Sequence, residues 1–453
     1  MSSQSLDVLG KWWLPGHEGH RVTGRLTWDV VEGGTLEMLG ELRPIALKDN
    51  VLPDGSVQKY REPLTKVDQQ YPMILGEVDD EGYTLLGSWS LNGRGFHRLR
   101  EHRERVCVNG VLVGAWYTDG DDLQADRAVF DIRHLTTWVD DSGVKTTYPR
   151  VEGEPNGPWA IVTAKHRRTR KIGHGDLTVK LWHHFDWTGD GEWTHGIAES
   201  WKLTVESKTM SDVDALTNVA VDVRALVTIA AGKSAEIEKV VLQHPAVAST
   251  IGSPPRSIRE DISYYSRWSH RAAEEPPARR QDLYFDLMTF GGIRGLGRWL
   301  TVARKYPTEL RRVMATRYTG DMYVEDRIMN TCAALESFDG TRRRNRRRED
   351  VEFADRITAC VKFAPPQLSA LLVEDMTTWV AAVVRVRNQV AHHGHVFRET
   401  GTAGEHLLAE QLYWLFVMCM LRVSGAPDAV FDSIGCHGQI RWLTEQARER
   451  PAT

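Results

Sequence analysis

The sequence predicts a multi-domain α+β protein, with an N-terminal all-β sandwich or barrel-like domain followed by a C-terminal all-α helical bundle. Many short segments of residues 1–255 are rich in β-branched and aromatic residues. Proline-rich stretches then interrupt the chain, and beyond them apolar residues recur every three or four positions. We therefore expect a β-rich domain over 1–255, a linker over 256–290 and a helical bundle over 291–453.

The expected strands are short, partly alternating between apolar and polar residues, and separated by turn sequences such as DDEG (79–82) and TGDGE (188–192). Tryptophans recur throughout this half, and core packing explains them better than a ligand-binding platform. The clearest strands are RLTWDVV (25–31), TLEMLGEL (35–42), YTLLGSWSL (83–91), RVCVNGVLVGAWYT (105–118), LTVKLWHHFDW (177–187) and ESWKLTVES (199–207).

The change to helical periodicity follows the stretches GSPPRS (252–257) and EEPPARR (274–280). The first segment with this helical periodicity is 321–340, and Gly340 is the expected end of its helix. Its apolar stripe consists of Val324, Ile328, Cys332 and Leu335. Further helices are expected over 367–393, 409–423 and 434–450.

Composition bounds the function classes. The 453 residues have a net charge of −4, with 41% hydrophobic and 26% charged residues, so any nucleic-acid contact must come from a local patch. Five scattered cysteines without a CxxC pair indicate a reducing compartment and no cysteine zinc site. We find no signal-peptide pattern, and the longest strongly apolar run, 412–421, is too short to cross a bilayer. We therefore expect a cytoplasmic protein with no membrane partner.

Two glycine-containing motifs do not qualify as cofactor sites. Gly232-Lys233-Ser234 lacks the glycine that a phosphate loop requires five residues earlier, where Val227 stands. GGIRGLG (291–297) follows no clear strand, does not match the dinucleotide fingerprint, and is better interpreted as a flexible joint. The sequence predicts no cofactor.

An arginine occupies the apolar stripe of the helix that is expected to end near His392. Arg387 stands where the pattern calls for a leucine, and a buried guanidinium usually has a partner or a task. A salt bridge to a neighbouring helix, or a side chain that reaches out to water, would be the purely structural explanation. The stripe consists of Leu372, Met376, Trp379 or Val380, Val383, Arg387 and Val390.

Arg387, Asn388 and His392 form a candidate catalytic set near the end of this helix. Histidine titrates near neutral pH and can move protons, whereas arginine holds phosphate in a two-pronged geometry. RNA supplies its own nucleophile, the 2′-hydroxyl, so this chemistry requires no metal. A metal site formed by His392, His393 and His395 is less favoured, since no carboxylate stands at a suitable helical spacing.

Similar arginine–histidine spacings occur elsewhere, so spacing alone is weak evidence. Arg127 with His134, and Arg168 with His174, both lie in the strand-rich half. Only the pair Arg387 and His392 closes a long apolar helix within the predicted bundle.

At these residues the sequence resembles the HEPN superfamily, whose signature is an arginine, usually a polar residue, and then a histidine after four to six intervening residues. RNQVAH (387–392) fits with four between, and AALESF (333–338) resembles the family's early helix. The resemblance covers roughly 290–450. The whole chain is more narrowly similar to ApeA-type anti-phage proteins, and GKWWLPGHEGHRVTGRLTWD (10–29) resembles the start of their N-terminal domain.

The resemblance implies a metal-independent endoribonuclease of bacterial anti-phage defence that halts host growth. It also implies a homodimer or higher oligomer that brings two arginine–histidine motifs together, with the β-rich domain as a sensor of a phage protein. The six arginines of TRRRNRRRED (341–350) either grip the RNA backbone or form a solvated loop. Two alternatives stay open: a non-catalytic HEPN scaffold that binds nucleotides, nucleic acid or a protein, and a carbohydrate- or protein-binding β-domain whose helical half only oligomerises.

Overall fold

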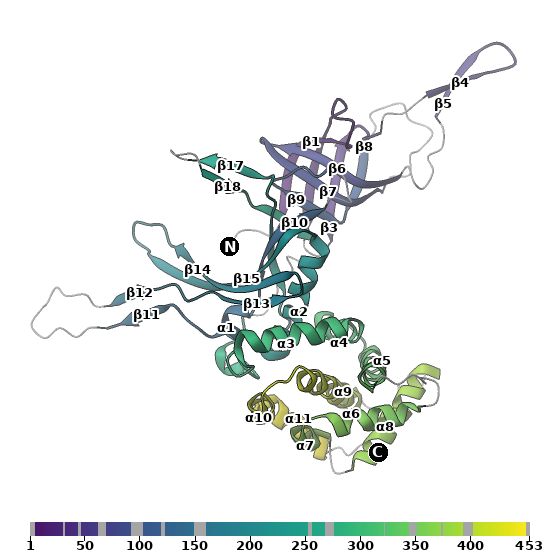
Figure 1. Ribbon diagram of the computed structural model, residues 1–453. Coiled ribbons are helices and arrows are strands. Elements are labelled where there is room, and N and C mark those ends of the chain that lie inside the picture. Colours follow the sequence, from purple (N-terminus) through teal and green to yellow (C-terminus); the bar gives the residue numbers. More distant parts are fainter. Residues whose placement is uncertain are drawn as a thin grey trace, which may run out of the picture.

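The computed structural model describes most of the chain. The described residues are 5–29, 32–43, 47–61, 69–91, 103–118, 123–148, 160–251, 256–267, 276–320, 322–343, 351–372, 375–392 and 402–449. A β-rich part (residues 6–266) is followed by an all-helical part (residues 292–449), which confirms the predicted fold class (Figure 1).

The strands of the β-rich part build one thirteen-stranded sheet, in which neighbouring strands pair antiparallel. Its order is β13-β14-β15-β10-β16-β19-β9-β7-β6-β1-β2-β3-β8. The strands are β1 (Leu6–Trp13), β2 (Val22–Asp29), β3 (Gly33–Leu39), β6 (Gln70–Val78), β7 (Glu81–Ser90), β8 (Arg103–Val108), β9 (Gly110–Val113), β10 (Gln124–Ile132), β13 (Arg170–His174), β14 (Leu177–Thr188), β15 (Gly196–Asp212), β16 (Ile237–Gln243) and β19 (Ile262–Ser266). Five of the six strands expected from the sequence are confirmed, whereas the expected strand over 105–118 is divided into β8 and β9 and its last residues are not in a strand.

One end of this sheet closes into a small barrel, because β8 pairs with both β3 and β7. In β2 every second residue is buried, which is the alternation expected of a strand with one face on a core. Trp12, Trp28 and Tyr71 fill the interior of the barrel. Gly76 leaves room for the indole of Trp12, since a Cβ there would lie 2.2 Å from the ring.

The other end of the sheet stays open and is covered by two helices, α1 (Leu135–Val139) and α2 (Val213–Ala231). The sequence did not predict α2. Its first turn is capped by Asp212, whose side chain accepts a hydrogen bond from the backbone N–H of Asp214 at 2.8 Å. It ends at Gly232, which adopts the left-handed conformation with φ of 65°.

The helical part lies beneath the open sheet in Figure 1. The helices are α3 (Gly292–Lys305), α4 (Pro307–Tyr318), α5 (Val324–Arg343), α6 (Phe353–Phe363), α7 (Ser369–Leu372), α8 (Met376–His392), α9 (Thr402–Val423), α10 (Asp428–Cys436) and α11 (Gly438–Glu449). Residues 291–297, interpreted above as a flexible joint, instead begin α3. Their glycines permit close packing, because a Cβ on Gly295 would lie 2.1 Å from the carbonyl oxygen of Phe290.

The open sheet, α2 and the helical part share one hydrophobic core. The indole of Trp299 in α3 donates a hydrogen bond to the carbonyl oxygen of Asp222 in α2 at 2.8 Å. The backbone N–H of Tyr284 donates to the carbonyl oxygen of Ala230, also at 2.8 Å. The helical part and the segment before it are therefore joined to α2 by packing and by hydrogen bonds to its backbone.

Several hairpins extend from the main sheet (Figure 1). They are β4 (Leu47–Val51) with β5 (Val57–Arg61), β11 (Val144–Thr147) with β12 (Ile161–Ala164), and β17 (Ala248–Ile251) with β18 (Arg256–Arg259). The range 256–290, predicted as a linker, thus contains β18 and also β19, which pairs with β16 and β9.

Two predicted helices differ from expectation. The helix expected to stop at Gly340 continues to Arg343, because the buried carboxylate of Asp339 pairs with Arg342 and Arg343 one turn later. The single helix expected over 367–393 is interrupted between α7 and α8. Asp375 supplies the reason, since its carboxylate accepts hydrogen bonds from the backbone N–H groups of Thr377 and Thr378 and starts a new helix.

In the part of the chain that the structure describes, no single helix has the length and apolar character needed to cross a membrane. One interrupted pair, Pro366–Leu372 with Met376–Ala391, reaches the required length and composition only when both pieces are taken together.

Candidate functional site

Arg387 lies on α8 at the place where its burial decreases. Trp379, Val380 and Val383 of the same helix are buried, whereas Arg387 and Val390 are half-buried. Leu372, placed on the same stripe by the sequence, belongs to the separate helix α7. The arginine therefore stands between the core and the solvent-facing end of α8.

The guanidinium of Arg387 packs against the neighbouring helix α6. Its Cζ lies 5.2 Å from the ring centroid of Phe353, at the start of α6. Its positive charge also acts on Cys332 of α5, where burial raises the pKa of the thiol to about 12 and the charge of Arg387 acts in the opposite direction. Among the described residues, no carboxylate forms an ion pair with Arg387. The salt bridge of the purely structural explanation is thus not found among the described residues.

The side chain of Asn388 is hydrogen-bonded to Arg387. The guanidinium Nη1 donates a hydrogen bond to the Asn388 side-chain oxygen at 3.1 Å, and Asn388 is exposed. His392 is the last residue of α8. Its imidazole lies outside the described residues, as do His393 and His395, so both the Arg387–His392 pairing and the metal alternative stay predictions. No group of three His, Cys, Asp or Glu residues that could hold a metal occurs in the described ranges.

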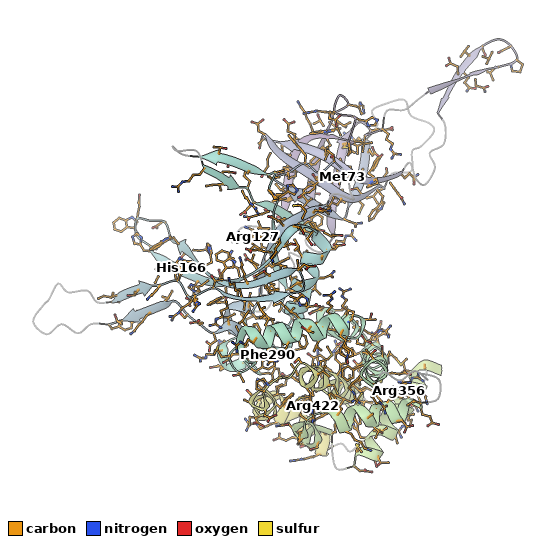
Figure 2. The ribbon with its side chains drawn as sticks, viewed as in Figure 1. Met73, Arg127, His166, Phe290, Arg356 and Arg422 are labelled. Carbon is orange, nitrogen blue, oxygen red and sulfur yellow. The ribbon has the colours of Figure 1, made fainter. Side chains whose placement is uncertain are left out.

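The AALESF segment (333–338) lies next to this arginine, on α5. Ala333, Glu336 and Ser337 line a cavity of about 220 Å³ together with Arg356 of α6, which is labelled in Figure 2. Arg356 is buried, and its Nε lies 4.0 Å from the Glu336 carboxylate. The two segments that resemble one family are therefore neighbours in space, on helices that pack together.

Two arginines of the arginine-rich run (341–350) form ion pairs within α5. Arg342 and Arg343 are paired with Asp339, whose side chain is fully buried, and Arg342 also lies over the ring of Phe363 at 4.4 Å. These two arginines share one carboxylate, so one positive charge remains between them, and their contact with RNA stays a prediction. The other four arginines of the run lie outside the described residues.

Arg127 and His134, one of the competing arginine–histidine pairs, have structural contacts. Arg127 forms an ion pair with Glu206 at 3.6 Å. His134 is buried, and its Nδ1 accepts a hydrogen bond from the backbone N–H of Ala278 at 3.0 Å. Burial lowers the pKa of His174, which lies in β13.

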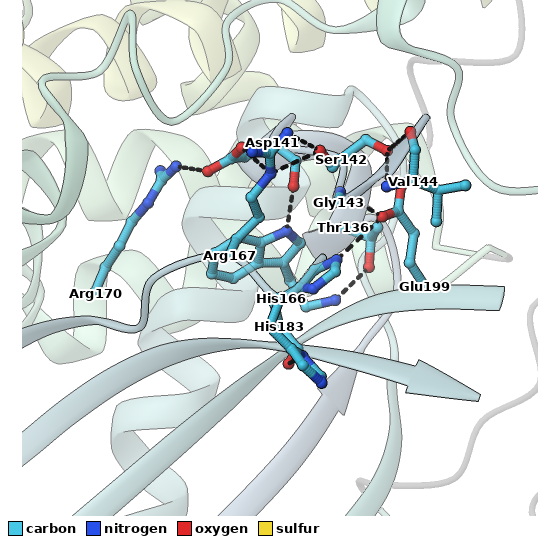
Figure 3. Close-up of polar contacts among 11 residues, drawn as sticks. Thr136, Asp141, Ser142, Gly143, Val144, His166, Arg167, Arg170, His183 and Glu199 are labelled. Carbon is cyan, nitrogen blue, oxygen red and sulfur yellow. Dashed lines mark hydrogen bonds and ion pairs between the residues drawn. The ribbon is translucent and has the colours of Figure 1, made fainter. Parts of the chain in front are cut away.

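The sequence does not predict a polar cluster around a buried histidine in the β-rich part (Figure 3). The ring of His183 is buried, and its Nε2 lies 3.1 Å from the Glu199 carboxylate, which also accepts a hydrogen bond from the backbone N–H of Gly143 at 2.7 Å. Burial acts to raise the pKa of Glu199, but hydrogen bonds, including those from Gly143 and His183, lower it below its ordinary value. Asp141 pairs with both Arg167 and Arg170 nearby. The cluster ties the base of the β11–β12 hairpin to β14 and β15.

A second missed feature is a polar cavity of about 210 Å³ at the junction of the two parts. It is lined by the turn after α2 and by residues of α4, α5, α9 and α11. The Gly232-Lys233-Ser234 motif belongs to this lining. No sequence pattern predicts the cavity, because its walls come from segments far apart in the chain.

Comparison with known proteins identifies the β-rich part. The domain family described as ApeA N-terminal domain 1 matches residues 7–286. No curated protein and no solved structure matches the chain. ApeA-family membership points to a role in anti-phage defence. Because the match covers more than half of the sequence and the β-rich fold described above, the chain belongs to the ApeA family.

Proposed function

We propose that this protein is a metal-independent endoribonuclease of anti-phage defence, with Arg387, Asn388 and His392 as its catalytic residues. The observation that carries the proposal is the setting of Arg387. It is half-buried, packs on an aromatic ring, hydrogen-bonds to Asn388 and has no carboxylate partner among the described residues. A guanidinium that is positioned but not neutralised can receive a phosphate group.

The proposed reaction is an intramolecular transesterification of RNA. The 2′-oxygen forms a bond to phosphorus while the bond from phosphorus to the 5′-oxygen breaks. A His392 imidazole takes the 2′-hydroxyl proton, and a second imidazole gives a proton to the leaving 5′-oxygen. The guanidinium of Arg387 stabilises the charge that develops on the phosphoryl oxygens. The products carry a 2′,3′-cyclic phosphate and a 5′-hydroxyl.

A second imidazole requires a second copy of the chain, so the proposal includes a homodimer or higher oligomer. The position of Arg387 near the solvent-facing end of α8 supports such a shared cleft, since two of these ends can meet without opening the core. The β-rich part is proposed to sense a phage protein, in keeping with ApeA-family membership.

Two incubations of the purified protein, one with total RNA and one with single-stranded DNA, test this function. We expect cleavage of RNA, intact DNA, and cyclic-phosphate ends on the products, with the same rate in a chelator. Loss of cleavage in chelator that zinc or magnesium restores would instead support the His392, His393 and His395 metal site. RNA that stays intact, including in the presence of a phage lysate, would support the non-catalytic scaffold.

A further inference from the structure

The β14–β15 hairpin extends beyond the main sheet as a two-stranded ribbon (Figure 1). The two strands pair with each other as far as Thr188 and Gly196. On the other side of β14, however, β13 pairs only with Leu177–Leu181. The outer part of β14, over residues 182–188, therefore forms a strand edge that no described strand covers.

Hydrogen bonds show which backbone groups of β14 face this edge. His183 lies opposite Trp201, yet the N–H of Trp201 donates to a hydroxyl group of α1 at 2.9 Å and so points away from β14. The backbone of His183 correspondingly points away from β15, and its carbonyl oxygen lies 3.3 Å from Nδ1 of His166. Because this direction alternates along a strand, the N–H and C=O groups of Phe185 and Trp187 face the same edge, and among the described residues they have no backbone partner there.

The edge lacks the features that usually prevent strand addition. Exposed edges of natural sheets commonly carry lysine, proline or a bulge. Residues 182–188 (WHHFDWT) contain no lysine and no proline, and their pairing with β15 runs without a register shift. An unprotected edge of this kind can accept an extended peptide segment.

Aromatic side chains follow one face of the ribbon. His183, Phe185 and Trp187 share this face, since side chains alternate along a strand. The ring of His166 packs on the first two, with 4.8 Å between its centroid and that of Phe185. Trp187 is 81% exposed, and Trp193 in the turn is 88% exposed, which makes them the two most exposed large hydrophobic side chains among the described residues. Exposed aromatic residues on one projecting element indicate a binding surface.

The turn that carries Trp193 is held by hydrogen bonds. One carboxylate oxygen of Asp190 accepts from the backbone N–H groups of Thr194, Trp193 and Glu192, at 2.9, 2.9 and 3.0 Å. The Thr194 hydroxyl accepts from the backbone N–H of Asp190 at 3.0 Å. These backbone hydrogen bonds lower the pKa of Asp190 to about 2, so its negative charge persists at neutral pH. An aromatic ring on a turn fixed in this way loses little conformational entropy on binding.

The ribbon is acidic, and its charge selects the kind of partner. Residues 181–201 contain four carboxylates and no lysine or arginine. Three of the four, Asp186, Asp190 and Glu192, lie in its outer part, whereas Lys165 and Arg168 flank His166 at the inner end of the edge. The outer end therefore repels RNA and anionic lipid, and it attracts lysine and arginine, whose cations also stack on indole rings.

We infer that the outer edge of β14 binds an extended segment of a partner protein, which adds to the sheet as a strand and carries basic and apolar residues. The backbone of this segment pairs with the edge-facing groups of Phe185 and Trp187. Its apolar side chains pack on the exposed indoles, and its basic side chains meet the carboxylates. The inference rests on the proposed sensing role of the β-rich part for the origin of the partner, but it does not depend on RNA cleavage.

A surface-display library of random short peptides, selected on the full-length protein without RNA, tests this surface. Trp187 and Asp186 lie on opposite faces of the ribbon, so we expect the enriched peptides to alternate apolar residues with lysine or arginine. Methylation of alternate backbone nitrogens in a synthetic copy of the most enriched peptide should weaken binding by about tenfold or more, because it removes donors for strand pairing but no side chain. Enrichment of acidic or patternless peptides, or an affinity that methylation leaves unchanged, would overturn the inference.

Variants of the exposed tryptophans locate the surface. Trp187→Thr removes the ring and keeps the backbone N–H, whereas Trp187→Pro removes both, so each should weaken peptide binding by about tenfold or more, the proline variant further. Trp193→Ser should also weaken it. Trp442→Ala, at a tryptophan of α11 that is 56% exposed, is the matched control and should bind like the wild type.

Two results with these variants would contradict strand addition by a partner protein. The first is wild-type affinity in both Trp187 variants. The second is a wild-type dimer that Trp187→Pro converts to monomers in the absence of peptide, since a second copy of the chain would then occupy the edge. Sedimentation and the peptide titration measure these outcomes on protein that needs no ribonuclease activity.

Discussion

The guanidinium of Arg387 lies over the ring of Phe353, with 5.2 Å between its Cζ and the ring centroid. This contact holds the arginine on the face of α8 that packs on α6, yet it uses none of the guanidinium N–H donors. One donor is engaged by Asn388. With respect to the described residues, Arg387 thus combines a fixed position with free hydrogen-bonding capacity, which is what the proposed site requires.

The first prediction concerns replacement of Arg387. Arg387→Lys keeps the charge but loses the planar fork, and Arg387→Ala loses both, so each should lower RNA cleavage by about 100-fold or more. The cation–π contact with Phe353 contributes only about 1 kcal/mol or less, so the melting temperature should change little. Arg385→Ala, two residues earlier on an exposed position, is the control and should keep its activity. A large loss of stability in Arg387→Ala would instead indicate a structural role.

The second prediction concerns pH and the junction. Burial raises the pKa of Asp222 to about 7 from its ordinary value of 3.8, while Arg311 acts in the opposite direction. The folded state therefore favours the protonated carboxyl, and this contribution to stability, complete below pH 3.8, is lost as the pH rises toward about 7. Asp222→Asn should stabilise the protein at pH 8 and flatten the pH dependence of its melting temperature over that window. A wild-type melting temperature that changes in parallel with that of the variant across this window would contradict the assignment.

The third prediction concerns the end of α5. Asp339→Ala removes a fully buried carboxylate that binds Arg342 and Arg343, so it should lower the free energy of unfolding by about 1–3 kcal/mol. Chemical denaturation measures this change. Asp326→Ala, on the exposed face of the same helix, should have a much smaller effect. Equal destabilisation by both variants would show that the Asp339 pairs contribute nothing specific.

The fourth prediction concerns assembly. If two copies of the α8 end form the proposed cleft, sedimentation of the active protein should give a dimer or a larger oligomer. Mixing Arg387→Ala chains with His392→Ala chains should then restore part of the activity, since one cleft can contain one intact residue of each kind. A fully active monomer would exclude the shared cleft.

The strands and most helices of this protein can be predicted from local patterns, but α2 cannot. Alternation is visible in β2 because only one face is buried. In α2 most residues are buried, from Val213 to Ala231, so its apolar residues show no clear helical stripe. The break before α8 was missed for another reason: the periodicity continues across it, and only the capping role of Asp375 reveals it.

The candidate functional features also divide into one that the sequence reveals and one that it does not. Arg387 stood out in the sequence because a charge interrupts an apolar stripe, and its proximity to the AALESF segment agrees with the resemblance that suggested both. The cavity at the junction gave no such signal. Lys233, Arg327 and Glu410 are far apart in the chain, and only the packing of α2 against the helices brings them together.

The most direct test of the central claim is a measurement of RNA cleavage by wild-type and His392→Ala proteins, both in the presence of a chelator and both with melting temperatures recorded. Removal of a proton carrier typically lowers a rate by about 10²–10⁴-fold, so the account predicts efficient cleavage by the wild type and a loss of this size in the variant, without loss of folding. His393→Ala is the matched control and should cleave RNA like the wild type. A His392→Ala protein that melts normally and cleaves RNA at the wild-type rate would contradict the account.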